Sequence, residues 1–236
     1  MNKYNSIIKY KNKLNDNIFI KVIENVKLRA DLFLMLRDIK NRGFYKIADE
    51  FSDFDPYPGY SKYLNIKPWF MDNLWRCYIL GLNNSKNKNI LDIGTGNGYF
   101  PFICKKYGHT VRTIDIASNP LFNSLIELLE IPRKEISVRS NEAIPVFDVK
   151  FDLVTGFHTY FNGHKSENVW TSKEWHFFLT DLKENHCSTN ASAYFIINKE
   201  PDRVNIFDDE LREYFISIGS EIDGDRVFIP NISNVS

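Results

Sequence analysis

Apolar residues recur at three- and four-residue spacing along the first part of the chain. Over residues 18–39 this spacing predicts one amphipathic helix, and Gly43 lies just beyond its expected end. The apolar positions of the pattern are Ile18, Val22, Ile23, Val26, Leu28, Leu32, Phe33, Leu36 and Ile39. A loop rich in turn formers and aromatic residues follows at 53–60, and a second helix is expected from Pro68 toward Gly81.

From residue 84 onward, segments typical of strands and of helices alternate. Strands are expected at 89–93, 110–115, 135–139, 151–157 and 192–198, and helices at 98–107, 118–130, 171–185 and 208–218. Such alternation favours parallel pairing with right-handed crossovers, and therefore a three-layer α/β fold with a doubly wound, mostly parallel sheet. Residues 221–229 predict an antiparallel hairpin across an Asp-Gly turn at the sheet edge. We expect a helical N-terminal extension over residues 1–83 and an α/β domain over 84–236.

The most specific motif lies where the first of these strands ends. Asp92 stands in the apolar strand 89–93, and glycine then occupies every second position, at Gly94, Gly96 and Gly98. Glycine permits positive φ and lets a ligand approach the main chain, and the helix that follows offers unpaired amide groups to a carboxylate or phosphate. The dinucleotide fingerprint Gly-x-Gly-x-x-Gly does not fit, because the third glycine comes one residue too early.

Counted from the acid, the pattern Asp92-x-Gly94-x-Gly96-x-Gly98 resembles the first motif of class I S-adenosylmethionine-dependent methyltransferases. The resemblance extends over roughly residues 84–230. It implies a Rossmann-like fold with S-adenosylmethionine as the cofactor. A carboxylate at Asp92 suits a ligand with an amino group and a sulfonium, and suits a pyrophosphate poorly.

The family resemblance implies further cofactor residues on the next strands. An acid at the tip of the second strand accepts the ribose hydroxyls in the family, which implies this role for Asp115, with Ile116 beside it in the cofactor site. Relatives bond the adenine amine with a polar residue after the third strand, and here Asn141 and Glu142 are both candidates. Phe157, at the end of the fourth strand, is expected to face the cofactor cleft.

The sequence also departs from parts of the family. Relatives that methylate base amines or glutamine amides carry Asn/Asp-Pro-Pro-Tyr after the fourth strand, whereas this chain has Gly-Phe-His-Thr at 156–159. Those acceptors are therefore disfavoured. Metal-dependent O-methyltransferases need clustered acids near that strand, and only Asp152 lies within it, so no metal is predicted.

Two histidines are candidates for a general base. His158 and His164 flank the segment after the fourth strand, which lies near the methyl group in this family, and histidine suits proton removal near neutral pH. The alternative for each is a structural histidine.

The N-terminal extension supplies candidate substrate residues. Class I enzymes commonly cover the site with such an extension, and here the covering segment would contribute Tyr57, Tyr60, Tyr63, Trp69 and Arg76. The alternative is that they form a packed aromatic cluster that steadies the extension.

Composition narrows the function further. Lys plus Arg and Asp plus Glu are both 30, so the formal net charge is zero, and the absence of a basic excess disfavours a nucleic-acid partner. The 3 cysteines have no close pair in the sequence, and no apolar run is long enough to span a membrane. We expect reduced, packed thiols and a cytoplasmic enzyme that methylates an oxygen or nitrogen of a small metabolite or sugar-like molecule. Alternatives are a protein or RNA acceptor, or a cofactor-binding domain without activity.

Overall fold

The computed structural model describes residues 18–52, 59–159, 161, 170–198 and 207–236. The chain forms two compact units. The first consists of Met1–Lys86, Asn97–Gly108 and Ala117–Ile131, and the second of Asn87–Gly96, His109–Ile116 and Pro132–Ser236. The predicted division of the chain near residue 84 into two domains stays a prediction.

The first unit is helical. Its elements are α2 (Ile18–Asn41), α3 (Phe44–Ser52), η1 (Ser61–Leu64), α4 (Ile66–Ile79), η2 (Leu82–Asn84), α5 (Tyr99–Lys106) and α6 (Pro120–Leu128). The long first helix is confirmed, and α4 begins two residues before the predicted start at Pro68. Helix α3 was not expected. It follows α2 after a two-residue turn, in which Gly43 takes φ +108°, and its buried residues are Phe44 and Phe51.

Helix α2 is packed through one face. Leu28, Leu32, Met35 and Ile39 are buried there, at positions that recur with the helical period. The Asp31 carboxylate accepts hydrogen bonds from the Tyr78 hydroxyl on α4 at 2.8 Å and from the Tyr107 hydroxyl after α5 at 2.7 Å. The three cysteines are buried and free, and the sulfurs of Cys77 and Cys104 lie 3.7 Å apart.

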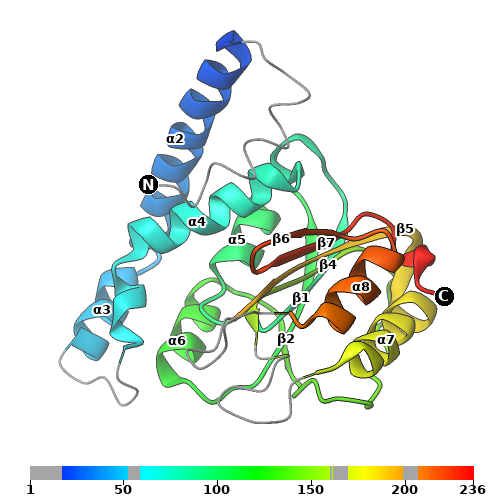
Figure 1. Ribbon diagram of the computed structural model, residues 1–236. Coiled ribbons are helices and arrows are strands. Elements are labelled where there is room, and N and C mark those ends of the chain that lie inside the picture. The colour runs from blue at the N-terminus through cyan, green and yellow to red at the C-terminus, as the bar shows by residue number, and fades with distance from the viewer. Residues whose placement is uncertain (1–17, 53–58, 160, 162–169, 199–206) are drawn as a thin grey trace. The chain divides into compact units, whose positions relative to one another are not determined.

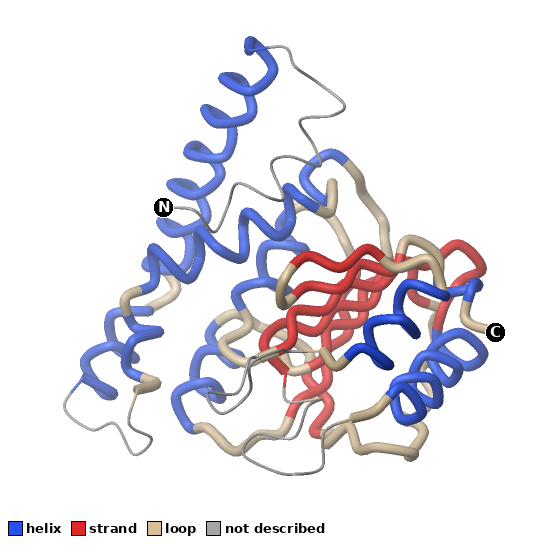
Figure 2. Tube along the Cα trace, in the orientation of Figure 1, coloured by secondary structure: helices blue, strands red, loops and turns tan. Residues whose placement is uncertain are grey.

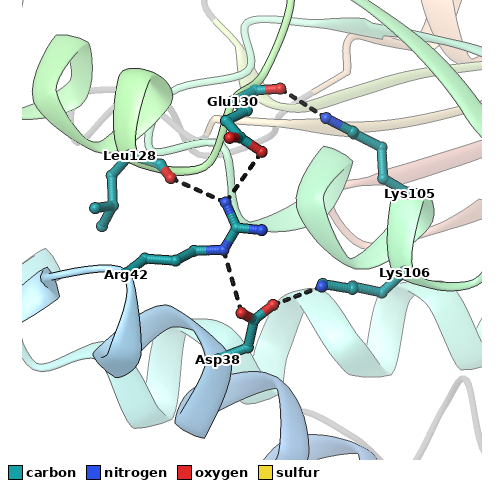
Figure 3. A network of polar contacts seen from close by, with 6 residues as sticks. All are labelled: Asp38, Arg42, Lys105, Lys106, Leu128 and Glu130. Carbon is teal, nitrogen blue, oxygen red and sulfur yellow. Dashed lines mark hydrogen bonds and ion pairs between the residues drawn. The ribbon is translucent and has the colours of Figure 1, made fainter.

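A second polar network joins α2 to α5 and α6 within this unit (Figure 3). The Arg42 guanidinium donates to the Asp38 carboxylate at 3.3 Å, to the Glu130 carboxylate at 3.1 Å and to the Leu128 carbonyl at 3.4 Å. Asp38 also pairs with Lys106, and Lys105 donates to the Glu130 carbonyl. These contacts fix the end of α2 against α5 and α6.

The second unit contains the sheet (Figures 1 and 2). Its strands are β1 (Asn89–Ile93), β2 (Thr110–Asp115), β3 (Arg133–Glu135), β4 (Phe151–Thr159), β5 (Cys187–Ile197), β6 (Glu221–Asp223) and β7 (Arg226–Ile229). Their order is β3-β2-β1-β4-β5-β7-β6, with β3, β2, β1, β4 and β5 parallel and the β6–β7 hairpin antiparallel at the edge. The chain runs outward from β1 to β3 and then returns to β4. The predicted doubly wound sheet with an edge hairpin is therefore confirmed.

Some strand bounds differ from the predictions. Strand β3 lies at Arg133–Glu135 and not at 135–139, because its pairing with Thr113–Asp115 decides where it begins. Strand β5 starts at Cys187, five residues earlier than expected, because β4 continues to pair with it there. The hairpin turn is centred on Gly224 and Asp225, and Gly224 takes φ +61°.

Helices α7 (Ser172–Asp181) and α8 (Asp209–Ser217) lie together beside the sheet in Figure 1, and a π-helical turn, Leu182–His186, leads from α7 into β5. Thr171 and Glu174 form a capping box at the start of α7. Trp175 is 1% exposed, and its ring centroid lies 5.0 to 5.5 Å from those of Phe161, Phe195 and Phe215. Among the described helices, none combines the length and apolarity that a membrane crossing requires.

Candidate functional site

The glycine loop is held in place by the tip of β2. The Gly94 amide donates to the Ile114 carbonyl at 2.8 Å, and the Gly96 amide donates to the Asp115 carboxylate at 2.7 Å. The loop lies at the carboxyl end of β1, next to the point between β1 and β4 where the strand order reverses. In open α/β sheets, ligands bind at such a switch point.

The three glycines of the motif all adopt the left-handed conformation that glycine alone takes without strain. Gly94, Gly96 and Gly98 have φ values of +71°, +52° and +75°. Space adds a second requirement, because a Cβ atom on Gly94 would lie 2.4 Å from Cγ2 of Thr159 at the end of β4. The loop backbone therefore carries no side chain where it passes β4.

Asp115 is anchored by two backbone amides. Its Oδ2 accepts from Gly96 and its Oδ1 from Ile116, each at 2.7 Å. Burial raises the pKa of this carboxyl above its ordinary value, while these two amides and the charge of Arg133 act in the opposite direction. A carboxylate oxygen has two lone pairs, so each oxygen keeps the capacity for a further bond. Ile116, the next residue, is 57% exposed although it is a large apolar side chain.

Asp92 occupies a different environment. It is 2% exposed, and its Oδ1 accepts from the hydroxyl of Thr155 at 2.7 Å. The two residues are register partners on β1 and β4. A direct contact between Asp92 and a ligand stays a prediction, since the structure shows its carboxylate joined to the neighbouring strand.

Unsatisfied hydroxyls at the loop allow a test of whether a polar ligand fits. Among the described residues, the buried side-chain oxygens without a hydrogen-bond partner include Oγ1 of Thr95, which is 7% exposed, and Oγ1 of Thr159. Thr95 lies between two of the motif glycines, and Thr159 faces Gly94. Buried polar groups are normally bonded. These hydroxyls, the bare loop and the anchored Asp115 together fit a ligand that carries hydroxyl and amino groups, as S-adenosylmethionine does.

His158 is a bulge residue at the end of β4. Phe157 pairs with Ile196 and Thr159 with Ile197, so His158 is the extra residue between two successive pairs. It takes φ +54° and is exposed, and its carbonyl accepts from the side-chain amide of Asn198 at 2.9 Å. Bulges often lie next to active sites, where they redirect a side chain, and strained backbone concentrates at such sites. The second predicted base, His164, lies outside the described residues.

The other cofactor candidates are dispersed around this edge. Asn141, with φ +58°, and Glu142 are both exposed in the segment between β3 and β4. Asn141 hydrogen-bonds the carboxylate of Glu174 and contributes to lowering its pKa, after the larger effect of Thr171. Glu142 lies 3.8 Å from the Arg139 guanidinium. Phe157 packs edge-on against Tyr194 of β5, with 5.8 Å between ring centroids.

Three of the substrate candidates meet in one cluster of the first unit. The Tyr63 ring lies 6.0 Å from Tyr60, 4.6 Å from Trp69 and 5.2 Å from Phe122 of α6. Tyr99, the first residue of α5, donates its hydroxyl to the Tyr63 carbonyl.

The remaining substrate candidates lie apart from this cluster or beyond the described residues. Arg76, seven residues beyond Trp69 on α4, bonds Asn73 at 2.8 Å. Tyr57 lies outside the described residues. A substrate role for the cluster stays a prediction, and its contacts equally fit a packed aromatic cluster.

Sequence reasoning missed three residues of the site. Thr155 is the hydrogen-bond partner of Asp92, Thr159 limits the space at Gly94, and Asn198 holds the carbonyl of His158. A signal existed only for Thr155, a single hydroxyl within the apolar run of β4. The other two contacts depend on the bulge and on the register between β4 and β5. Asp152, by contrast, accepts from the Asn89 amide and the Ser188 hydroxyl at the opposite end of the strands.

Parts of this chain are similar to known proteins. No family model matches the chain. A tRNA U34 carboxymethyltransferase of Nautilia profundicola is 29% identical over 148 residues, which cover 60% of this chain and 44% of that protein. The chain therefore spans less than half the length of this relative.

Two solved structures of methyltransferases are also similar to part of this chain. An amino pentose methyltransferase from Micromonospora echinaspora, with S-adenosylmethionine bound, has 18% identity and a TM-score of 0.45, over 65% of this chain and 61% of that chain. A ribosomal protein L11 methylase from Lactobacillus delbrueckii subsp. bulgaricus has 16% identity and a TM-score of 0.41, over 66% of this chain and 75% of that chain.

The relative found by sequence is named as a carboxymethyltransferase. The strand order shows the doubly wound fold that the resemblance to class I methyltransferases predicted.

Proposed function

We propose that this chain is an S-adenosylmethionine-dependent methyltransferase whose cofactor binds at the loop of Gly94, Gly96 and Gly98. The observation that carries the proposal is the hydrogen bond from the Gly96 amide to Asp115, which joins a bare, left-handed loop to an anchored acid on the next strand. When bound, the cofactor would supply a methyl group carried on a cationic sulfonium. After transfer of the methyl group, the sulfur would be left as a neutral thioether.

The residues around the loop have chemical properties that suit different parts of the cofactor. Asp115 retains lone pairs for two ribose hydroxyls, and the exposed side chain of Ile116 offers an apolar surface to the adenine ring. Asp92 and Thr155 support the first strand behind the loop. Asn141 or Glu142 would bond the adenine amine, and Phe157 would border the cofactor cleft.

The residues of the β4 bulge would handle the acceptor. In the proposed reaction His158 removes a proton from the acceptor oxygen or nitrogen, and His164 is the second candidate for this step. Asn198 is a positioning residue, because its amide fixes the carbonyl of His158 and with it the bulge. Holding acceptor and methyl group in line contributes a proximity effect of up to about 7–11 kcal/mol in ideal systems.

Two acceptor classes follow from different observations. The zero net charge and the aromatic cluster of Tyr60, Tyr63 and Trp69 favour a small-molecule acceptor. In this form of the proposal the enzyme acts in the cytoplasm, and the extension of residues 1–83 would serve as a lid. The second candidate is RNA, because the relative found by sequence is named for tRNA position U34. That relative is more than twice as long as the aligned region, so its acceptor comes to this chain only as a proposal.

The test of cofactor binding uses two glycines with the same backbone conformation. Gly94→Ala places a Cβ 2.4 Å from Thr159, whereas Gly224→Ala, at φ +61° in the hairpin, meets nothing within 4 Å. Titration calorimetry with S-adenosylhomocysteine should show binding by the wild type and by Gly224→Ala, and greatly weakened binding by Gly94→Ala. Binding of NAD with no response to S-adenosylhomocysteine would refute the proposal.

A further inference from the structure

The zero net charge of the chain conceals an uneven distribution along the sequence. Residues 1–83 contain 14 Lys and Arg against 9 Asp and Glu, whereas residues 84–236 contain 16 against 21. The N-terminal extension is therefore net positive by 5 charges and the remainder net negative by 5. A basic excess on one segment is the electrostatic signature of a nucleic-acid-binding surface, and the average over the chain hides it.

Within the described residues, the exposed side of α2 gathers these cations around apolar side chains. Arg29, Phe33, Arg37 and Lys40 are exposed at spacings of four, four and three residues, which places them on one stripe of the helix. Phe33 is 65% exposed and Val26, on the same stripe, is 64% exposed. Both belong to the apolar pattern that predicted the helix, yet neither is packed in the core of the unit.

The acids of α2 lie elsewhere on the helix. Asp31 and Asp38 are partly buried, and each is held by named partners: Asp31 by two tyrosine hydroxyls and Asp38 by Arg42 and Lys106 (Figure 3). A helical wheel puts both acids, and Glu24 as the third acid of the helix, on the side opposite Arg29 and Lys40. The positive charge of the stripe is therefore not balanced by the carboxylates of its own helix.

Aromatic rings accompany the cations. The Arg37 guanidinium lies 5.8 Å from the centroid of the Phe33 ring, and the Lys40 ammonium lies 5.6 Å from that of Tyr45 on α3. Tyr45 is 56% exposed. Lys46 beside it is also exposed, while the acids of α3, Asp49 and Glu50, lie one turn further along. Exposed rings stack on unpaired bases while neighbouring cations bind the phosphates, which is how single-stranded nucleic acid is bound.

We propose that Arg29, Phe33, Arg37, Lys40 and Tyr45 form a docking surface for RNA, with the cations on backbone phosphates and the rings on unstacked bases. The inference rests on the proposed function in its RNA-acceptor form and assigns a second binding surface besides the methyl-transfer site. A second copy of this chain fits the surface less well, because a two-fold interface would place these cations against their own copies.

The test compares two double variants that lose the same charge. Arg29→Ala/Arg37→Ala removes two cations of the stripe, and Lys173→Ala/Arg212→Ala removes two exposed cations of α7 and α8 in the other unit. Anisotropy with a fluorescein-labelled RNA stem–loop is followed from about 50 to about 200 mM salt. The stripe variant should bind at least about tenfold more weakly, with a salt slope smaller by about two, while the control pair stays near wild type.

The ring contribution is separated by Phe33→Ala. This variant should lower RNA affinity about 5- to 100-fold with an unchanged salt slope, because stacking involves no counterion release. Equal weakening by both double variants, or absence of RNA binding by the wild type, overturns the proposal. So does a wild-type dimer in sedimentation velocity that Phe33→Ala dissociates, or binding to phosphatidylserine vesicles with no affinity for RNA.

Titration of the same variants with S-adenosylhomocysteine separates the two proposals. Unchanged affinity for S-adenosylhomocysteine together with lost RNA binding supports the surface. Retained RNA binding in a protein that does not bind S-adenosylhomocysteine refutes the proposed function and leaves the surface in place.

Discussion

Two regions of the second unit use the same strands in opposite ways. Against α7 and α8, the strands present aromatic and aliphatic side chains, and Trp175, Phe195 and Phe215 are almost completely buried with ring centroids 5.2 to 5.5 Å apart. At the carboxyl ends of β1, β2 and β4, the structure has left-handed glycines, a partly buried carboxyl with a raised pKa and a histidine at φ +54°. The first region is dominated by close apolar packing, whereas the second brings together strained backbone and a desolvated acid.

The difference separates stability from function. Close-packed apolar rings contribute to the free energy of unfolding wherever they lie, whereas a desolvated acid and a strained bulge cost free energy that only a function explains. Substitutions in the apolar region should therefore lower stability with little effect on ligand binding. Substitutions at the carboxyl-end edge should do the reverse.

The largest effect is expected at the bulge. His158→Ala should lower the turnover number by about 10²- to 10⁴-fold, the size of general-base assistance, with nearly unchanged affinity for S-adenosylhomocysteine. Steady-state kinetics from pH 5 to pH 9 should show a wild-type rate that rises through the range where histidine titrates, near about 6.5. A flat profile, or a variant with near-normal turnover, would show that His158 is not the base.

The next largest effect is expected in the apolar region, on the free energy of unfolding. Trp175→Ala should lower the free energy of unfolding by about 3–5 kcal/mol, because a completely buried indole leaves a large cavity. Phe177→Ala, two residues along the same helix at a ring 37% exposed, is the control and should cost far less. Urea denaturation measures both. Equal losses in the two variants would mean that burial does not decide the stability of this region.

A smaller effect is expected at the ribose candidate. Asp115→Ala should weaken binding of S-adenosylhomocysteine by about 1.5–3 kcal/mol, the scale of hydrogen bonds to a charged group, while the fold stays intact. Asp223→Ala, at an exposed acid of the edge hairpin, removes the same charge and serves as the control. Calorimetry on the folded variants measures the difference. An unchanged affinity in Asp115→Ala would place the ribose elsewhere.

The smallest effect concerns pH and a histidine outside the site. Burial lowers the pKa of His186, against the opposing charge of Asp181, whose Oδ2 lies 3.4 Å from Nε2. The unfolded chain therefore binds the proton more readily, so the free energy of unfolding should fall as pH drops below about 6.5, by no more than about 1.4 kcal/mol per pH unit. Urea denaturation at pH 7.5 and 5.5 should show a smaller difference in His186→Phe. An identical difference would assign the pH dependence to other groups.

Much of the fold and part of the site were predictable because they depend on neighbours in the chain. The strand 89–93, the helix after the glycine loop and the strand ending in Asp115 follow from local hydrophobic period and glycine positions. The three glycines predicted a bare loop, and all three adopt positive φ. The family resemblance singled out Asp115 at the tip of the second strand, and in the structure its carboxylate accepts from the Gly96 amide.

Other features required contacts between distant segments. The early start of β5 was missed because its pairing with β4 decides it, and that pairing does not follow from local periodicity. The hydrogen bond of Thr155 to Asp92, the contact of Thr159 with Gly94 and the hold of Asn198 on His158 each depend on strand register. The exposure of Phe33 was hidden too, because periodicity shows that a helix has an apolar side but not which apolar residues find a partner.

The sequence by itself thus determined the order of elements, the glycine loop and the acid that accompanies it, since each is written in a short stretch of chain. Only the tertiary structure decided where β4 bulges, which hydroxyls remain unbonded and which face of α2 stays exposed. These properties depend on register and packing between residues far apart in the sequence. A one-residue change of register moves every side chain of a strand to the other face. The local sequence pattern does not determine the register at the end of β4.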